Sequence, residues 1–134
     1  MKKRLAFLLA AFTLVVATAW ALGLNGGVIS VTNSPGGTGV TGLLQCVYND
    51  ANDATHATTW QIRRLVPNNP PPWGSPRKVS PAANPVAVSV DTGATYRDYE
   101  IQFTATPPDT FTGQNPYSIR VYCNQLYTFK VHYQ

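Results

Sequence analysis

Hydrophobic and polar residues alternate along most of the chain that follows the N-terminal apolar run. Successive side chains of a β-strand point to opposite faces, so this period of two predicts strands rather than helices. The clearest alternation runs from Tyr117 to Cys123 and again from Tyr127 to Tyr133, with a tight turn at Asn124-Gln125 between them that predicts a hairpin. The other predicted strands are residues 28–32, 40–48, 58–65, 86–90 and 99–103.

The segments between these strands are rich in Gly, Pro, Asn and Asp, which favour turns and loops. The longest, from Pro67 to Pro85, holds seven of the eleven prolines. Proline lacks the N–H that a sheet ladder needs, so this stretch is predicted as a stiff connection and not a central strand. No helix longer than one turn is expected after the N-terminal run.

The N-terminus has the three parts of a secretory signal. Lys2-Lys3-Arg4 precedes an apolar region from Leu5 to Val16. Small residues then offer two cleavage sites, Ala17-Thr18-Ala19 and Ala19-Trp20-Ala21, of which the second is preferred. We therefore expect a signal peptide over residues 1–21 and a mature domain over 22–134 that is secreted, periplasmic or on the cell surface. The alternative is an uncleaved anchor, because residues 5–24 are just long enough to span a bilayer.

Charge and composition narrow the functional classes. The chain has 134 residues with ten Lys and Arg and six Asp and Glu, and three of the basic residues lie at positions 2–4. The pI of about 9.3 therefore reflects the export segment and does not indicate nucleic-acid binding. With only two His and six acids, we expect no catalytic site and no cofactor.

The two cysteines are expected to form one disulfide, because an exported protein meets oxidising conditions. Two free buried thiols are the alternative. The order Cys46, Trp60 and Cys123 resembles the immunoglobulin-like fold over about residues 40–134. The resemblance implies that Trp60 packs on a bridge between the second and sixth strands.

We therefore predict an all-β protein: a single antiparallel immunoglobulin-like β-sandwich of about seven strands. The parity of the strands predicts which side chains point inward. The expected core contains Leu44, Trp60, Ile62, Ile119 and Val121.

One polar loop could bind a cation. Asp50, Asn52 and Asp53 offer hard oxygen ligands of the kind that Ca²⁺ prefers, and His56 lies nearby. The spacing matches no complete calcium motif. A polar turn held by Asn and Asp side chains is the competing interpretation.

One pair of carboxylates could act in catalysis. Asp98 and Glu100 share a face of one predicted strand, and paired carboxylates carry out glycoside hydrolysis. A solvated strand face beside Arg97 explains the same pattern without any activity.

The most unusual local feature is Trp73, which follows three consecutive prolines. A Trp on a stiff segment loses little entropy on binding. Basic residues precede and follow it, which suggests a surface for a glycan, an anionic polymer or another protein; these are Arg63, Arg64, Arg77 and Lys78. The alternative is that Trp73 folds back as a lid over the sandwich.

The first strand is a second candidate for binding. Val28, Ile29 and Val31 are followed by a Gly-rich hinge, so residues 22–39 could detach and complete a neighbour's sheet by strand addition. An ordinary first strand that stays on its own domain is the alternative.

These features predict an exported, non-enzymatic binding or structural protein of the cell envelope or extracellular space. Its expected partner is a second copy, another envelope protein or a glycan surface, and a membrane only if the N-terminal segment is retained. Two alternatives remain: a secreted enzyme or inhibitor with its site in the Pro-rich or acidic loops, and a membrane-tethered filament subunit.

Overall fold

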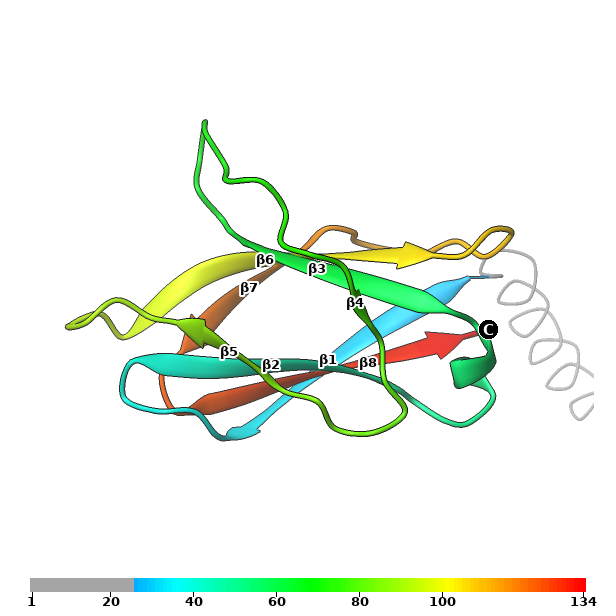
Figure 1. The fold of residues 1–134 in the computed structure, drawn as a ribbon, viewed down its shortest axis with the longest axis horizontal. Helices are drawn as coiled ribbons and strands as arrows, with labels where there is room; N and C mark the ends of the chain where they lie inside the picture. The colour runs from blue at the N-terminus through cyan, green and yellow to red at the C-terminus, as the bar shows by residue number, and fades with distance from the viewer. Residues whose placement is uncertain (1–25) are drawn as a thin grey trace, which may run out of the picture.

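A computed structural model describes residues 26–134, which form a sandwich of two four-stranded β-sheets (Figure 1). The predicted signal peptide, its cleavage site and the alternative membrane anchor lie outside the described residues. The elements are β1 (Gly27–Pro35), β2 (Thr41–Tyr48), the 3-10 turn η1 (Asp53–Thr55), β3 (Thr58–Arg64), β4 (Arg77–Lys78), β5 (Val86–Ser89), β6 (Tyr96–Ala105), β7 (Tyr117–Tyr122) and β8 (Gln125–Tyr133). The predicted all-β fold class is confirmed.

The first sheet has the strand order β1-β8-β2-β5, and the second has the order β4-β3-β6-β7. All neighbouring strands are antiparallel except β2 and β8, which pair in parallel from Leu43–Leu126 to Tyr48–Val131. The C-terminal strand β8 therefore lies between β1 and β2, and it pairs with β1 over nine positions. The C-terminal strand thus lies inside the first sheet beside β2, and β1 forms one edge of that sheet.

The predicted hairpin between the last two strands is wrong. β7 is an edge of the second sheet, whereas β8 lies inside the first. The chain crosses between the sheets through Asn124, whose φ of 62° and N–H bond to the Thr38 carbonyl (3.0 Å) fix a sharp corner. Both strands place alternate side chains in the same core, so their matching sequence patterns indicate burial and not mutual pairing.

The core lies between the sheets, where the inward faces of the strands meet. Leu44, Ile101, Val121, Phe129 and Val131 are completely buried, and Trp60 is 2% exposed. Of the other predicted core residues, Ile62 and Ile119 are partly buried and pack against this cluster. Phe103 packs on Phe129 and Phe111 with ring centroids 6.0 and 5.7 Å apart, so aromatic contacts join the two layers.

The predicted disulfide is contradicted by the structure: Cys46 and Cys123 are both free. Cys46 is buried in the middle of β2, and burial raises the pKa of its thiol. Cys123 lies one residue beyond β7, in the turn toward β8, with its Sγ 4.0 Å from the Ala94 carbonyl. The predicted sixth strand is β7, an edge of the second sheet, and Cys123 lies beyond its end, whereas Cys46 is buried within β2 of the first sheet.

Candidate functional site

The proline-rich connection folds back against the outer edge of β3. The Gly74 N–H donates to the Ile62 carbonyl (3.0 Å), and the Gln61 side-chain amide donates to the Gly74 carbonyl (3.0 Å). The prolines before Gly74 restrict the backbone, and these two bonds fix the position of the loop on β3. In Figure 1 the rest of this connection, between β3 and β4, projects beyond the two sheets.

Trp73 is half-buried on the outside of the second sheet and is not part of the core cluster. The Arg63 guanidinium lies over its ring, 4.1 Å from the centroid, and donates to Glu100 from Nε at 2.6 Å. Trp73 therefore does not cover the sandwich as a lid. It forms a stacked unit with Arg63, and Glu100 fixes the orientation of that unit.

The other predicted basic residues lie along the same edge of the second sheet. Arg64 ends β3, and Arg77 and Lys78 form β4, opposite Trp60 and Thr59 of β3. All three side chains are exposed. The five residues that the sequence suggested as a binding surface therefore lie on β3, on β4 and on the connection between them, and Arg63 and Trp73 are in contact.

Asp98 and Glu100 do share the outer face of β6, but each is paired with a different arginine. Arg120 contacts both carboxylate oxygens of Asp98 at 3.0 and 3.4 Å, and it also lies 4.0 Å above the ring of Tyr96. Glu100 accepts from Arg63. Each carboxylate is thus paired with an arginine on a neighbouring strand. This arrangement links β6 to β3 and β7 on the outer face of the second sheet.

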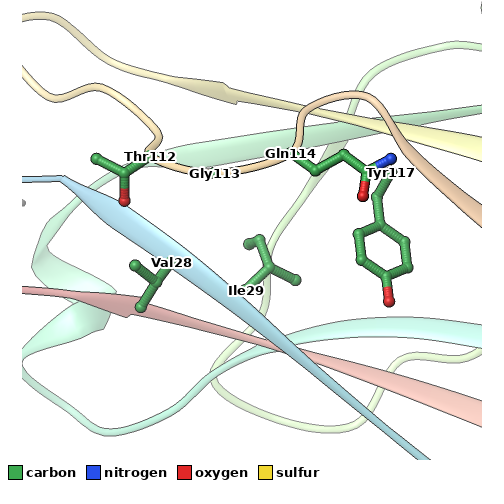
Figure 2. A pocket seen from close by; sticks show the side chains of 6 residues that line it. All are labelled: Val28, Ile29, Thr112, Gly113, Gln114 and Tyr117. Carbon is green, nitrogen blue, oxygen red and sulfur yellow. The ribbon is translucent and has the colours of Figure 1, made fainter.

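The first strand β1 is an edge of the first sheet, and a groove of about 300 Å³ lies beside it. Figure 2 shows the groove between β1, with Val28 and Ile29, and the segment that runs from Thr112 to Tyr117. None of the apolar side chains of β1 is fully buried. An open backbone edge and an apolar groove therefore lie side by side.

The N-terminal end of β1 is fixed to its own domain. The Gly27 N–H donates to the Thr110 carbonyl at 2.7 Å, and the Thr112 N–H donates to the Gly27 carbonyl at 3.0 Å. A Cβ at Gly27 would lie 2.5 Å from the Phe111 ring, so only glycine permits this close approach. Val28, Ile29 and Val31 thus form a strand of their own domain in this structure, and beyond Gly27 no other strand of residues 26–134 covers its edge.

A polar cluster at the C-terminal end of β8 was only partly anticipated. Asp53 is 2% exposed, and it accepts from the Tyr133 N–H (2.8 Å), the Asp50 N–H (3.2 Å) and His132 Nδ1 (3.0 Å). Burial by itself would raise the pKa of Asp53, but these hydrogen bonds and the His132 charge together lower it. Asp53 therefore holds the 49–57 loop against the last strand.

The residues of the suggested calcium site do not combine as predicted. The ligand atoms of Asp50, Asp53 and His132 lie within 4.8 Å of one another, whereas the Asn52 carbonyl accepts from Thr55. Both Asp53 oxygens already face N–H donors, and a cation would have to displace them. The geometry fits a polar turn with a buried carboxylate better than a set of oxygen ligands for Ca²⁺.

A second histidine contact was missed by the sequence reasoning altogether. His56 Nδ1 lies 2.8 Å from Asp109 Oδ2, and the imidazole stacks on the Tyr133 ring with centroids 4.3 Å apart. The Tyr133 hydroxyl in turn lies 2.5 Å from Thr58 Oγ1, and burial raises the pKa of Tyr133. No local signal could have found this cluster, since its members lie up to 77 positions apart in the sequence.

Comparisons with known proteins find no match to the chain among family models, curated proteins or solved structures. Within residues 26–134, none of the helical segments is long and apolar enough to cross a membrane. What the fold defines is the class, an all-β sandwich of two four-stranded sheets.

Proposed function

We propose that this protein is an exported, non-enzymatic structural protein that associates with a second copy by strand addition along the free edge of β1. Strand addition uses the unpaired backbone groups of an edge strand for affinity and adjacent pockets for specificity. The β1 edge and its groove have both features.

The observation that carries this proposal is the contrast between β1 and the other edge strands of the described sandwich. β4 has two residues, β5 has four, and the six residues of β7 include Arg120. β1 has nine residues and no charged side chain. Proteins commonly protect their edges with short strands, charges or prolines, so a long uncharged edge favours pairing with another chain.

The groove beside β1 supports the same proposal. Its apolar lining comes from Val28 and Ile29 on β1 and from Tyr117 on β7. Alternate side chains of an added strand point to one face, so they would enter this groove while the backbone pairs with β1. Two copies pairing antiparallel through β1 would form a two-fold dimer with one continuous sheet.

Acceptance of a strand fits this structure better than donation of β1. β1 makes nine register pairs with β8, and its start is fixed by the bonds at Gly27. The predicted hinge is also tied down, because the Gly36 N–H donates to the Asn124 carbonyl at 3.1 Å. Donation would have to break all of these contacts, whereas acceptance breaks none.

The sandwich itself is proposed to be a variant of the immunoglobulin-like architecture. The order β4-β3-β6-β7 and the pairing of β2 with β5 correspond to the strand neighbours of that fold. The variant feature is β8, which separates the first strand from the second.

The test is the oligomeric state of the mature protein, measured by sedimentation velocity over a wide concentration range. Wild type should associate as concentration rises. A variant with Ser30→Lys and Thr32→Lys places two charges on the exposed part of β1 and should remain monomeric with unchanged thermal stability.

The matched control is Ala87→Lys, on the exposed face of β5 at the other edge of the same sheet. It should associate like wild type. A wild-type protein that stays monomeric throughout, or a control that loses association as completely as the β1 variant, would contradict the proposal.

A further inference from the structure

The charged side chains of the described residues are distributed unevenly. Three of the six carboxylates pair with Arg63, Arg97 or Arg120, and the other three contact one of the two histidines. Four of the seven Lys and Arg in residues 26–134 have no acidic partner: Arg64, Arg77, Lys78 and Lys130. Three of these four lie along the β3–β4 edge of the second sheet, so positive charge is concentrated there.

These cations are spread in a line along the edge, with Arg77 and Lys78 pointing to opposite faces of the sheet. Arg77 pairs with Trp60 near the start of β3, and Arg64 lies four residues further along the same strand. At about 3.3 Å per residue, the line is about 13 Å long. Such a row of exposed charges of one sign attracts an anionic partner with several charges and matches a chain better than a single small ion.

An aromatic group lies between the two ends of this line. Arg63 is held by Glu100 at 2.6 Å and covers the Trp73 ring at 4.1 Å, and the loop that carries Trp73 is bonded to β3 at Gly74. The ring and guanidinium are therefore oriented before any ligand binds, which lowers the entropy lost on association. We call Arg63, Arg64, Trp73, Arg77 and Lys78 the β4 patch.

The backbone at this edge argues against a peptide as the occupant. β4 has only two residues, and Pro76 precedes it directly. Pro81 follows three positions after its end. Proline has no N–H to donate, so an added strand would find few partners here. Recognition at the β4 patch must use side chains.

We propose that the β4 patch binds an anionic polysaccharide. Guanidinium groups form paired hydrogen bonds with sulfate and carboxylate groups, and Lys78 adds a point charge. The C–H face of a sugar ring carries partial positive charge and packs favourably on the negative face of an aromatic ring such as Trp73. This site is separate from the β1 edge and does not depend on self-association.

The experiment measures binding of two probes to the mature protein by isothermal titration calorimetry at about 50 mM salt, where exposed charges are only partly screened. A heparin oligosaccharide presents sulfates, and an oligogalacturonate presents carboxylates. Binding to at least one is expected, and their relative affinities identify the anionic group. Affinity should fall steeply as the salt concentration is raised.

Two variants locate the site. Replacing Arg64, Arg77 and Lys78 together by Ala should weaken binding about tenfold, as expected for the loss of three exposed charge contacts. Trp73→Ala should weaken it about threefold to tenfold through the lost ring contact. Both should keep the thermal stability of wild type, because none of the four residues belongs to the core.

Lys130→Ala is the matched control, since it removes the fourth unpaired cation, which lies on β8 of the other sheet. It should change affinity by less than about twofold. Polyglutamate and single-stranded DNA of similar charge should bind more weakly than the better polysaccharide.

Three results would overturn the proposal. The first is no binding to either polysaccharide at low salt. The second is equal weakening by Lys130→Ala and a single β4-patch substitution such as Lys78→Ala, which would mean that only net charge matters. The third is tighter binding of polyglutamate or DNA, which would assign the patch to a protein or nucleic-acid partner.

Discussion

At the scale of single residues, Asp53 shows how a buried charge can hold a loop and a strand together. Three donors converge on its carboxylate, two of them backbone N–H groups that the fold fixes in place. An ionised carboxylate that accepts several hydrogen bonds is stabilised relative to its protonated form. The lowered pKa of Asp53 therefore links the stability of this end of the sandwich to pH.

Stability should consequently fall in acid. The folded-state pKa of Asp53 is below its unfolded value of about 3.9. The stabilisation by ionised Asp53 is therefore fully present above about pH 3.9 and is lost as the pH falls through the folded-state pKa. Asp53→Asn should lower the free energy of unfolding at pH 7 by about 1–3 kcal/mol. The same substitution should flatten the acid limb of a urea-denaturation series. An equally steep acid limb in the variant would assign the acid sensitivity to other groups.

At the scale of elements, the corner between β7 and β8 requires the two sheets to approach closely. Gly42 of β2 lies at this approach: a Cβ there would be 2.3 Å from Val121 Cγ1 and 2.9 Å from the Tyr122 carbonyl oxygen. The close contact lets β8 enter the first sheet directly after β7 leaves the second. A one-carbon side chain at Gly42 would push the layers apart.

Gly42→Ala should therefore destabilise the protein by about 1–3 kcal/mol, the usual cost of overpacking. Gly39→Ala is the control, because its Cβ would meet nothing within 4 Å. That variant should be neutral or slightly stabilising, since alanine restricts the unfolded chain. Chemical denaturation of both variants measures the difference, and similar values for the two would contradict the packing argument.

At the scale of the whole molecule, the first and last strands of the described chain, β1 and β8, pair with each other in the first sheet. β8 is paired on one side with β1 and on the other with β2, and Phe129 and Val131 of β8 are completely buried. Removing β1 would convert β8 from a central strand into an edge. The first sheet depends on β1 even though β1 itself buries little.

Deletion of residues 22–33 should thus yield a destabilised or aggregating protein, because β8 loses most of its nine-position pairing with β1. Circular dichroism during thermal unfolding, together with the soluble fraction, measures this outcome. A soluble, folded protein that no longer associates would instead identify β1 as a strand donated to a neighbour.

The sequence by itself determined seven of the eight strands and many of their inward residues, because the alternation of apolar and polar residues is a local property, and it missed only the two-residue β4. Residues predicted for strands near 58–65 and 117–123 are strands, and Leu44, Trp60 and Val121 are buried. The sequence also placed Trp73 on a connection with basic residues before and after it, which the structure assigns to the end of β3 and to β4.

Tertiary structure alone decided which strands pair and which distant side chains meet. Tyr117–Cys123 and Tyr127–Tyr133 look like two arms of a hairpin, yet they lie in different sheets, and the cysteines do not meet. The contact of His56 with Asp109 and the placement of β8 between β1 and β2 join segments that no short window contains. Strand pairing depends on which arrangement buries the apolar faces of all the strands at once. The alternation of apolar and polar residues shows which face of each strand is buried, but it does not show which strand lies beside it.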